Sequence, residues 1–118
     1  MSLDLEAADL LERAADALES GRLGWMQGRL VDHLGRVCAV GALRTVAGNL
    51  DRVDLATSRA VELAERHVPE VPGLQADLDS VKLVRTRNLV WWNDRVATDV
   101  NEVIELFKYT AKEVRNAQ

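Results

Sequence analysis

The stretch from residue 37 to residue 48, VCAVGALRTVAG, constrains the fold of this chain most strongly. It holds a single charged residue and Cys38, the only cysteine in the sequence. A helix that is apolar on nearly every side is buried inside a core and does not lie on its surface. Its small residues, Gly41 among them, would let neighbouring helices approach closely, and Gly48 supplies a left-handed stop. We therefore predict a short central helix enclosed by other helices.

Helical periodicity recurs on both sides of this stretch, and several segments begin with a capping residue. Ser2 and Asp54 are N-cap residues by type and position, and Asp99 has the capping-box spacing to Glu102. The pattern between residues 83 and 91 is irregular and leaves a break in that helix open. The predicted outer helices cover residues 3–19, 55–67, 74–92 and 100–114.

Residues 23–37 are irregular, because three glycines interrupt them. The sequence Asp-His-Leu-Gly at residues 32–35 is typical of a turn. Across that turn, residues 28–31 would pair with residues 36–38 as a tiny β-hairpin, which would leave the fold class unchanged. We predict one compact all-α domain spanning residues 1–118, a length that suits a single domain, with about five helices around the buried central one.

Composition excludes several classes of function. The chain has 47% apolar and 29% charged residues, as ordinary soluble globular proteins do. Its net charge of −4 makes nucleic acid an unlikely partner. A basic cluster at residues 82–95 keeps nucleic-acid or nucleotide binding as a weaker alternative to a solvated face. The cluster consists of Lys82, Arg85, Arg87 and Arg95.

The expected location is the cytoplasm. A single cysteine cannot form an internal disulfide, which favours a reducing compartment. No apolar run approaches the ~20 residues that a membrane span requires, so we expect no membrane partner. One cysteine and two distant histidines do not make a zinc site, and we expect neither a metal nor a cofactor.

Cys38 is the residue with the clearest nucleophilic chemistry. Near the first turn of a helix, unpaired amides and the helix dipole favour the thiolate. A cysteine-dependent hydrolase or transferase would use Cys38 as nucleophile and His33 as base, with His67 as the other histidine available. Asn93 or Asp94 would then orient the base. The alternative is that Cys38 is a small buried hydrophobic residue.

Three tryptophans against one phenylalanine and one tyrosine are unusual for a small core. Trp91 and Trp92 are adjacent and cannot share one helical face, so one should point outward or cover a groove. A surface Trp91, or a groove lined by tryptophans, would anchor a partner protein. Core packing with one partly exposed ring is the alternative. The sequence Trp92-Asn93-Asp94 is predicted to form a turn and cap between two helices.

Three pieces of the sequence together resemble a known family. They are Gly24-Trp25-Met26-Gln27-Gly28, Cys38-Ala39-Val40-Gly41-Ala42-Leu43, and Trp92-Asn93-Asp94 followed by Thr98 and an amphipathic helix. The family comprises small proteins of unknown function from actinobacteria and their phages, mycobacteriophages especially. The resemblance implies no established activity. It implies a single constellation made by Trp25, Gln27, Cys38, Gly41, Trp92, Asn93 and Asp94, with Trp91 beside it.

In this constellation, Asn93 and Asp94 would hold the N-terminus of the central helix or the loop at residues 24–28. Because the sequence lacks a catalytic signature, has surplus tryptophans and carries its charge in blocks, we expect a protein-interaction module that binds another protein or itself, and that acts on a host protein if a phage encodes it. An enzyme that uses Cys38 is the alternative, and we favour a protein without enzymatic activity.

Overall fold

The computed structural model describes residues 2–48, 54–69 and 88–118. Residues 88–91 are helical and lead directly into η2, a π-helical segment. The all-α class is confirmed. The predicted helix over residues 74–92 is tested only at its C-terminal end, because residues 70–87 lie outside the described ranges, as do residues 1 and 49–53. The named elements are α1 (Leu3–Glu19), α2 (Ala39–Ala47), α3 (Leu55–Glu65), η2 (Trp92–Val96) and α5 (Val100–Asn116).

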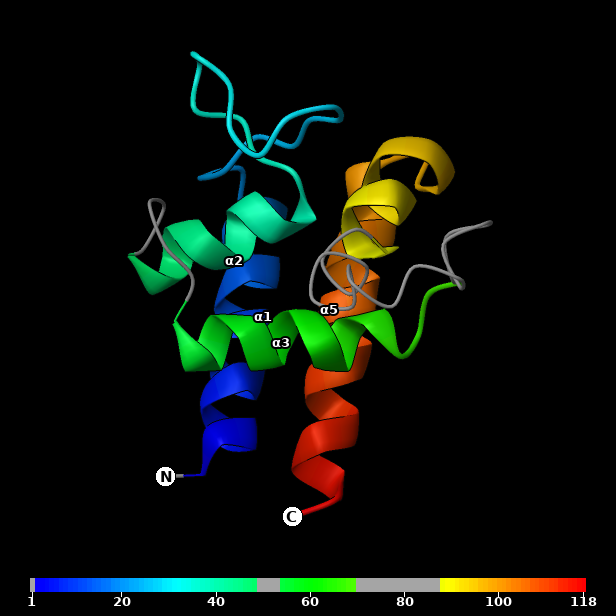
Figure 1. Ribbon diagram of the computed structural model, residues 1–118. Helices are drawn as coiled ribbons and strands as arrows, with labels where there is room; N and C mark the ends of the chain where they lie inside the picture. Colours follow the sequence, from blue (N-terminus) through cyan, green and yellow to red (C-terminus); the bar gives the residue numbers. More distant parts are fainter. Residues whose placement is uncertain (1, 49–53, 70–87) are drawn as a thin grey trace, which may run out of the picture.

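The two longest helices, α1 and α5, lie side by side, and α3 crosses in front of both (Figure 1). Helix α2 packs on α1 and α3, so α1 contacts α2, α3 and α5. Both termini lie at one end of this arrangement, and the loop between α1 and α2 lies at the opposite end (Figure 1). No helix within the described ranges is both long and apolar enough to cross a membrane.

The outer helices bury the stripes that their periodicity predicts. On α1 the buried face is rich in alanine, which lets its neighbours approach closely, and on α5 it centres on the fully buried Phe107. Ser2 accepts a hydrogen bond from the Leu5 amide at 3.1 Å, and Asp54 accepts one from the Thr57 amide at 2.7 Å. The capping box at the start of α5 is also present. These predicted helix starts are confirmed.

The central helix is buried over its first five residues and half-buried over the remainder. Gly48 ends it in the left-handed conformation, with φ of 77°, as predicted. Gly41 has a different role from the expected one. A Cβ at Gly41 would lie 2.0 Å from the carbonyl oxygen of Leu30. The close approach at Gly41 is therefore made by loop backbone.

The loop between α1 and α2 is held together by single β-bridges. Val37 forms a parallel bridge with Trp25 and an antiparallel bridge with Val31. The turn between Val31 and Val37 is closed by the Gly35 amide, which donates to the Asp32 carbonyl at 3.0 Å. The predicted hairpin is thus present in reduced form, as one antiparallel bridge and a turn.

The prediction of a turn at Trp92-Asn93-Asp94 is wrong, because these residues lie in η2. The Ala97 amide donates to the Trp92 carbonyl at 2.8 Å, which is the five-residue spacing of a π-helix. Such widened turns are rare and depend on contacts outside the helix. Local sequence patterns carry no signal for those contacts.

Candidate functional site

The side chain of Asn93 is fully buried and uses all four hydrogen-bonding positions of its amide. Its Oδ1 accepts hydrogen bonds from Trp25 Nε1 at 2.7 Å and from the backbone amide of Ala39 at 3.0 Å. Its Nδ2 donates to the Met26 carbonyl at 3.1 Å and to Asp94 Oδ1 at 2.9 Å. Two donors face the oxygen and two acceptors face the nitrogen, so the surroundings define the orientation of this amide.

The hydrogen bond from Ala39 to Asn93 gives a partner to a buried backbone amide at the start of α2. The first amides of a helix have no partner within the helix, and a buried helix start exposes none of them to water. Asn93 satisfies the Ala39 amide, and Cys38 Sγ accepts from the Gly41 amide at 3.4 Å. The central helix therefore begins on a side chain that lies 54 positions away in the sequence.

Three further hydrogen bonds hold the loop at residues 25–28 against η2 and its C-cap residue, Ala97. Gln27 Nε2 donates to the backbone carbonyls of Asn93, at 2.9 Å, and Ala97, at 3.0 Å. The Gly28 amide donates to Asp94 Oδ1 at 2.9 Å. We name Trp25, Gln27, Asn93 and Asp94 the Asn93 clasp. The clasp joins the loop, the start of α2 and η2.

The structure brings most of the predicted constellation together at this clasp, with Cys38 and Gly41 at the adjoining end of α2. Trp25 and Trp92 pack against the hydrophobic core, and Trp91 is half-buried. None of the three tryptophans is exposed to the extent that an aromatic anchor on the surface would be.

Cys38 has the properties of a core residue. Only 2% of it is exposed, and burial raises the pKa of its thiol above the ordinary value. The hydrogen bonds from the Gly41 and Val40 amides lower that pKa by less, and the negative charge of Asp94 raises it further. The thiol therefore stays protonated near neutral pH.

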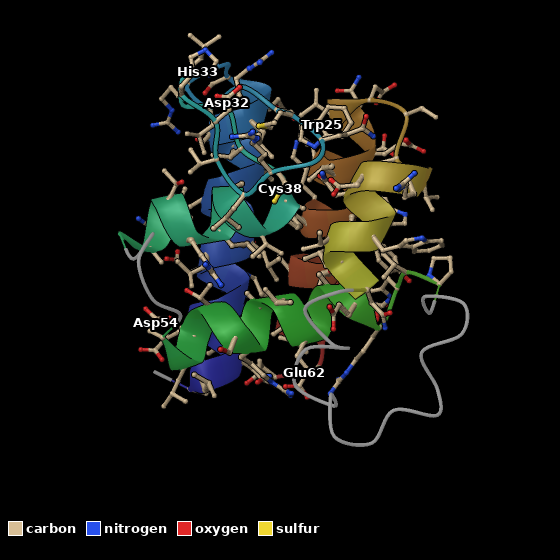
Figure 2. All side chains as sticks on the ribbon, turned by 45° about the horizontal axis from the view of Figure 1, so that its top comes forward. Trp25, Asp32, His33, Cys38, Asp54 and Glu62 are labelled. Atoms are coloured by element: carbon tan, nitrogen blue, oxygen red, sulfur yellow. The ribbon has the colours of Figure 1, made fainter. Side chains whose placement is uncertain are left out.

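The structure does not bring a histidine to Cys38. Neither histidine forms a hydrogen bond with the thiol within the described part of the chain. His33 lies out on the loop while Cys38 lies beneath it (Figure 2). His67 follows α3, with its ring 4.9 Å from that of Tyr109 and its Nε2 3.9 Å from a Glu113 oxygen.

Two other predictions concern ligands. Among residues 2–48, 54–69 and 88–118, no group of three or more histidine, cysteine or acidic side chains is placed to hold a metal ion. Of the predicted basic cluster, Arg95 lies within these residues and is exposed. Lys82, Arg85 and Arg87 lie outside them.

Sequence reasoning predicted a turn at residues 32–35 but did not single it out as a functional site. We name the solvent-facing part of this loop, residues 31–36, the hairpin tip. Asp32 organises it with one carboxylate. Its Oδ1 accepts from the backbone amides of Leu34 and Arg36, each at 2.9 Å. Its Oδ2 accepts from Arg36 Nε at 2.7 Å, and only 5% of the Asp32 side chain is exposed. Burial acts to raise the pKa of this carboxyl, but the bonds from Arg36 and Leu34 bring it below its usual range.

Leu34 is held outward by this turn, with 69% of its surface exposed, and Val31 beside it is 38% exposed. The available signal was an apolar residue inside the turn sequence at residues 32–35. Turns run over protein surfaces, so an apolar side chain within one faces water unless another element covers it.

The described residues thus define an all-α protein with a structural clasp centred on the buried Asn93 and with an exposed hairpin tip. The chain belongs to DUF6197, a family of unknown function, whose family model matches residues 2–113. Comparison with curated proteins gives no match, and comparison with solved structures gives none. Membership of an uncharacterised family agrees with the resemblance described above. An origin in actinobacteria or their phages stays a prediction.

Proposed function

We propose that this protein is a protein-interaction module and that the hairpin tip is its docking element. The observation that carries the proposal is the exposure of Leu34, 69%, in a turn whose backbone is fully organised. Single exposed apolar residues are common on protein surfaces. Leu34 differs from most of them because the turn holds it in one place before any partner arrives.

That preorganisation lowers the cost of binding. Association loses free energy when loops and side chains must be ordered at an interface. Here three hydrogen bonds to Asp32 order the turn, and the bridge between Val31 and Val37 ties it to the start of α2. The Asn93 clasp holds the other side of the same loop on η2.

The residues that suggested an enzyme, Cys38 and Asn93, are buried and make hydrogen bonds within the fold. An activated cysteine has a lowered pKa and is reachable by substrate, whereas Cys38 is buried and has a raised pKa. Asn93 has no hydrogen-bonding position left for a substrate or a base. These properties support a binding role in preference to cysteine-dependent catalysis.

The test compares Leu34→Asp with a matched control, Leu55→Asp. Leu55 is 78% exposed in the first turn of α3, at a different place on the molecule, and an acidic residue suits a helix start. Wild-type protein and both variants are immobilised and exposed to lysate of an actinobacterium, the predicted source or host. Each retained protein is then purified and its Kd for all three chains is measured.

We expect a partner that binds the wild-type chain and Leu55→Asp equally. Burying a leucine contributes about 1.5–3 kcal/mol, so Leu34→Asp should weaken binding about tenfold or more. Thermal unfolding of the variants checks that the fold is intact. Partners that bind Leu34→Asp as tightly as the wild type would refute the assignment of the hairpin tip.

A further inference from the structure

The carboxylates nearest the hairpin tip and η2 are engaged within the fold, whereas two arginines beside them are unpaired within the described part of the chain. Asp32 accepts three hydrogen bonds within the turn. Asp94 accepts bonds from the Gly28 amide and from Asn93. Asp99 and Glu102 form the capping box of α5. These four carboxylates are therefore engaged by backbone amides, by the Asn93 side chain and, at Asp32, by the Arg36 guanidinium.

The cations at the same end face outward. Arg29 and Arg95 are exposed, and within the described part of the chain neither guanidinium forms a hydrogen bond or an ion pair. They stem from one place, because Gly28 and Asp94, the residues just before them, are hydrogen-bonded at 2.9 Å. Arg36 remains 51% exposed in its pair with Asp32.

Along the chain, these arginines flank the exposed apolar residues. Arg29 lies two positions before Val31, and Arg36 lies two positions after Leu34. The protein as a whole has a net charge of −4, so this positive character is local. A surface of this kind is complementary to an apolar pocket with a negative rim.

We infer that the partner of the hairpin tip is a protein that receives Leu34 in an apolar pocket bordered by aspartate or glutamate side chains. This inference rests on the proposed function and adds the chemistry of the partner. Its carboxylates meet the exposed guanidinium groups of Arg29 and Arg95. The charges speed the encounter, and the leucine lengthens the lifetime of the complex.

A protein surface fits these groups better than a lipid or a nucleic acid does. Stable membrane attachment needs more apolar area than one leucine and one half-exposed valine supply. Binding of single-stranded nucleic acid relies on aromatic rings on which bases stack. Trp25 is the tryptophan of this loop and is half-buried with its N–H bonded to Asn93, and the exposed ring at the hairpin tip is a single imidazole, that of His33.

The test uses the partner recovered through Leu34-dependent capture. Association and dissociation rate constants are measured for the wild type, Arg29→Glu and Arg95→Glu at low and high salt. The control is Lys112→Glu, the same reversal of charge on an exposed residue of α5 near the other end of the molecule. We expect each arginine variant to lower the association rate about three- to tenfold at low salt, with an effect that shrinks as salt rises. Lys112→Glu should change neither rate.

A second measurement locates the carboxylates. Arg29→Lys and Arg95→Lys keep the charge and supply amines that a carbodiimide couples directly to nearby carboxylates. Mass spectrometry of the coupled complex should identify aspartate or glutamate residues around one apolar pocket of the partner. Coupling should be lost when Leu34→Asp is added.

The outcomes separate the two proposals. A partner that binds through Leu34 with an association rate that neither salt nor Arg29→Glu nor Arg95→Glu changes would overturn this inference. That result would leave the docking role of the hairpin tip intact. The absence of any Leu34-dependent partner would overturn both. Leu34-dependent binding to phosphatidylglycerol vesicles, or to single-stranded RNA, with no protein partner would also overturn both and assign the surface to that ligand.

Discussion

Replacing Asn93 by alanine should lower the free energy of unfolding by about 4 kcal/mol. The substitution removes four hydrogen bonds at a site with no solvent exposure. Each such bond contributes about 1 kcal/mol net, and a buried partner left without a bond costs a similar amount or more. Domains of this size are stable by about 5–15 kcal/mol, so the loss is a large fraction of the total.

The assay is urea unfolding at neutral pH, followed by far-UV circular dichroism and by tryptophan fluorescence. Trp25 donates directly to the amide that is removed, so its emission should also shift in the folded variant. The control is Asn101→Ala, the same chemical change at an exposed position in the first turn of α5. Its effect should stay within about 0.5 kcal/mol.

A loss below about 1 kcal/mol for Asn93→Ala would refute the reasoning. It would mean that the clasp does not hold the loop, the start of α2 and η2 together. Trp25→Phe provides an intermediate case, because it removes one donor and leaves Oδ1 of Asn93 with the Ala39 amide. That variant should lose about 1–2 kcal/mol.

Four further predictions concern separate features. Gly41→Ala should destabilise the fold by about 2 kcal/mol or more, since its Cβ would overlap the Leu30 carbonyl oxygen; a melting temperature equal to the wild type would contradict this. Thr57→Val should stabilise it by about 1 kcal/mol in urea unfolding, because the buried Thr57 hydroxyl has no hydrogen-bond partner among the described residues; a loss of stability would count against it. Cys38 should resist alkylation in the native protein from pH 5 to pH 9 and react after unfolding, since burial raises its pKa; rapid native labelling with a midpoint well below about 8.5 would overturn this. Asp4→Asn should reduce the loss of stability on acidification. The hydrogen bond from the Arg59 guanidinium on α3 lowers the pKa of Asp4, so the stability that this carboxylate contributes is present above the ordinary carboxyl pKa and disappears as the pH falls through the lowered value. Unchanged acid unfolding would contradict this.

Local sequence predicted the helices well, because the interactions that define them act over three or four residues. The start of α1 at Leu3 follows from Ser2, the start of α3 follows from Asp54, and that of α5 follows from the Asp99–Glu102 box. The apolar composition of residues 37–48 was likewise sufficient to predict a buried helix ending at Gly48.

The candidate site was predictable in its membership and unpredictable in its geometry. Trp25, Gln27, Asn93 and Asp94 were grouped by resemblance to a family, and the hydrogen bonds from Trp25 and Gln27 to Asn93 join positions 68 and 66 residues apart. No helical or strand periodicity relates such positions. The π-helical segment that begins at Trp92 was missed for the same reason, since Gln27 of the distant loop donates to the carbonyls of Asn93, within it, and Ala97, directly after it.

The sequence by itself determined the helical class, the helix starts, the stop at Gly48 and the buried character of the central helix, because local propensity, capping and periodicity encode them. Tertiary structure alone decided three other properties. It placed Asn93 on the first amide of α2, enclosed the Cys38 thiol and left Leu34 in water at the end of a rigid turn. Each depends on which distant segment covers a side chain, and that is settled only when the whole chain packs.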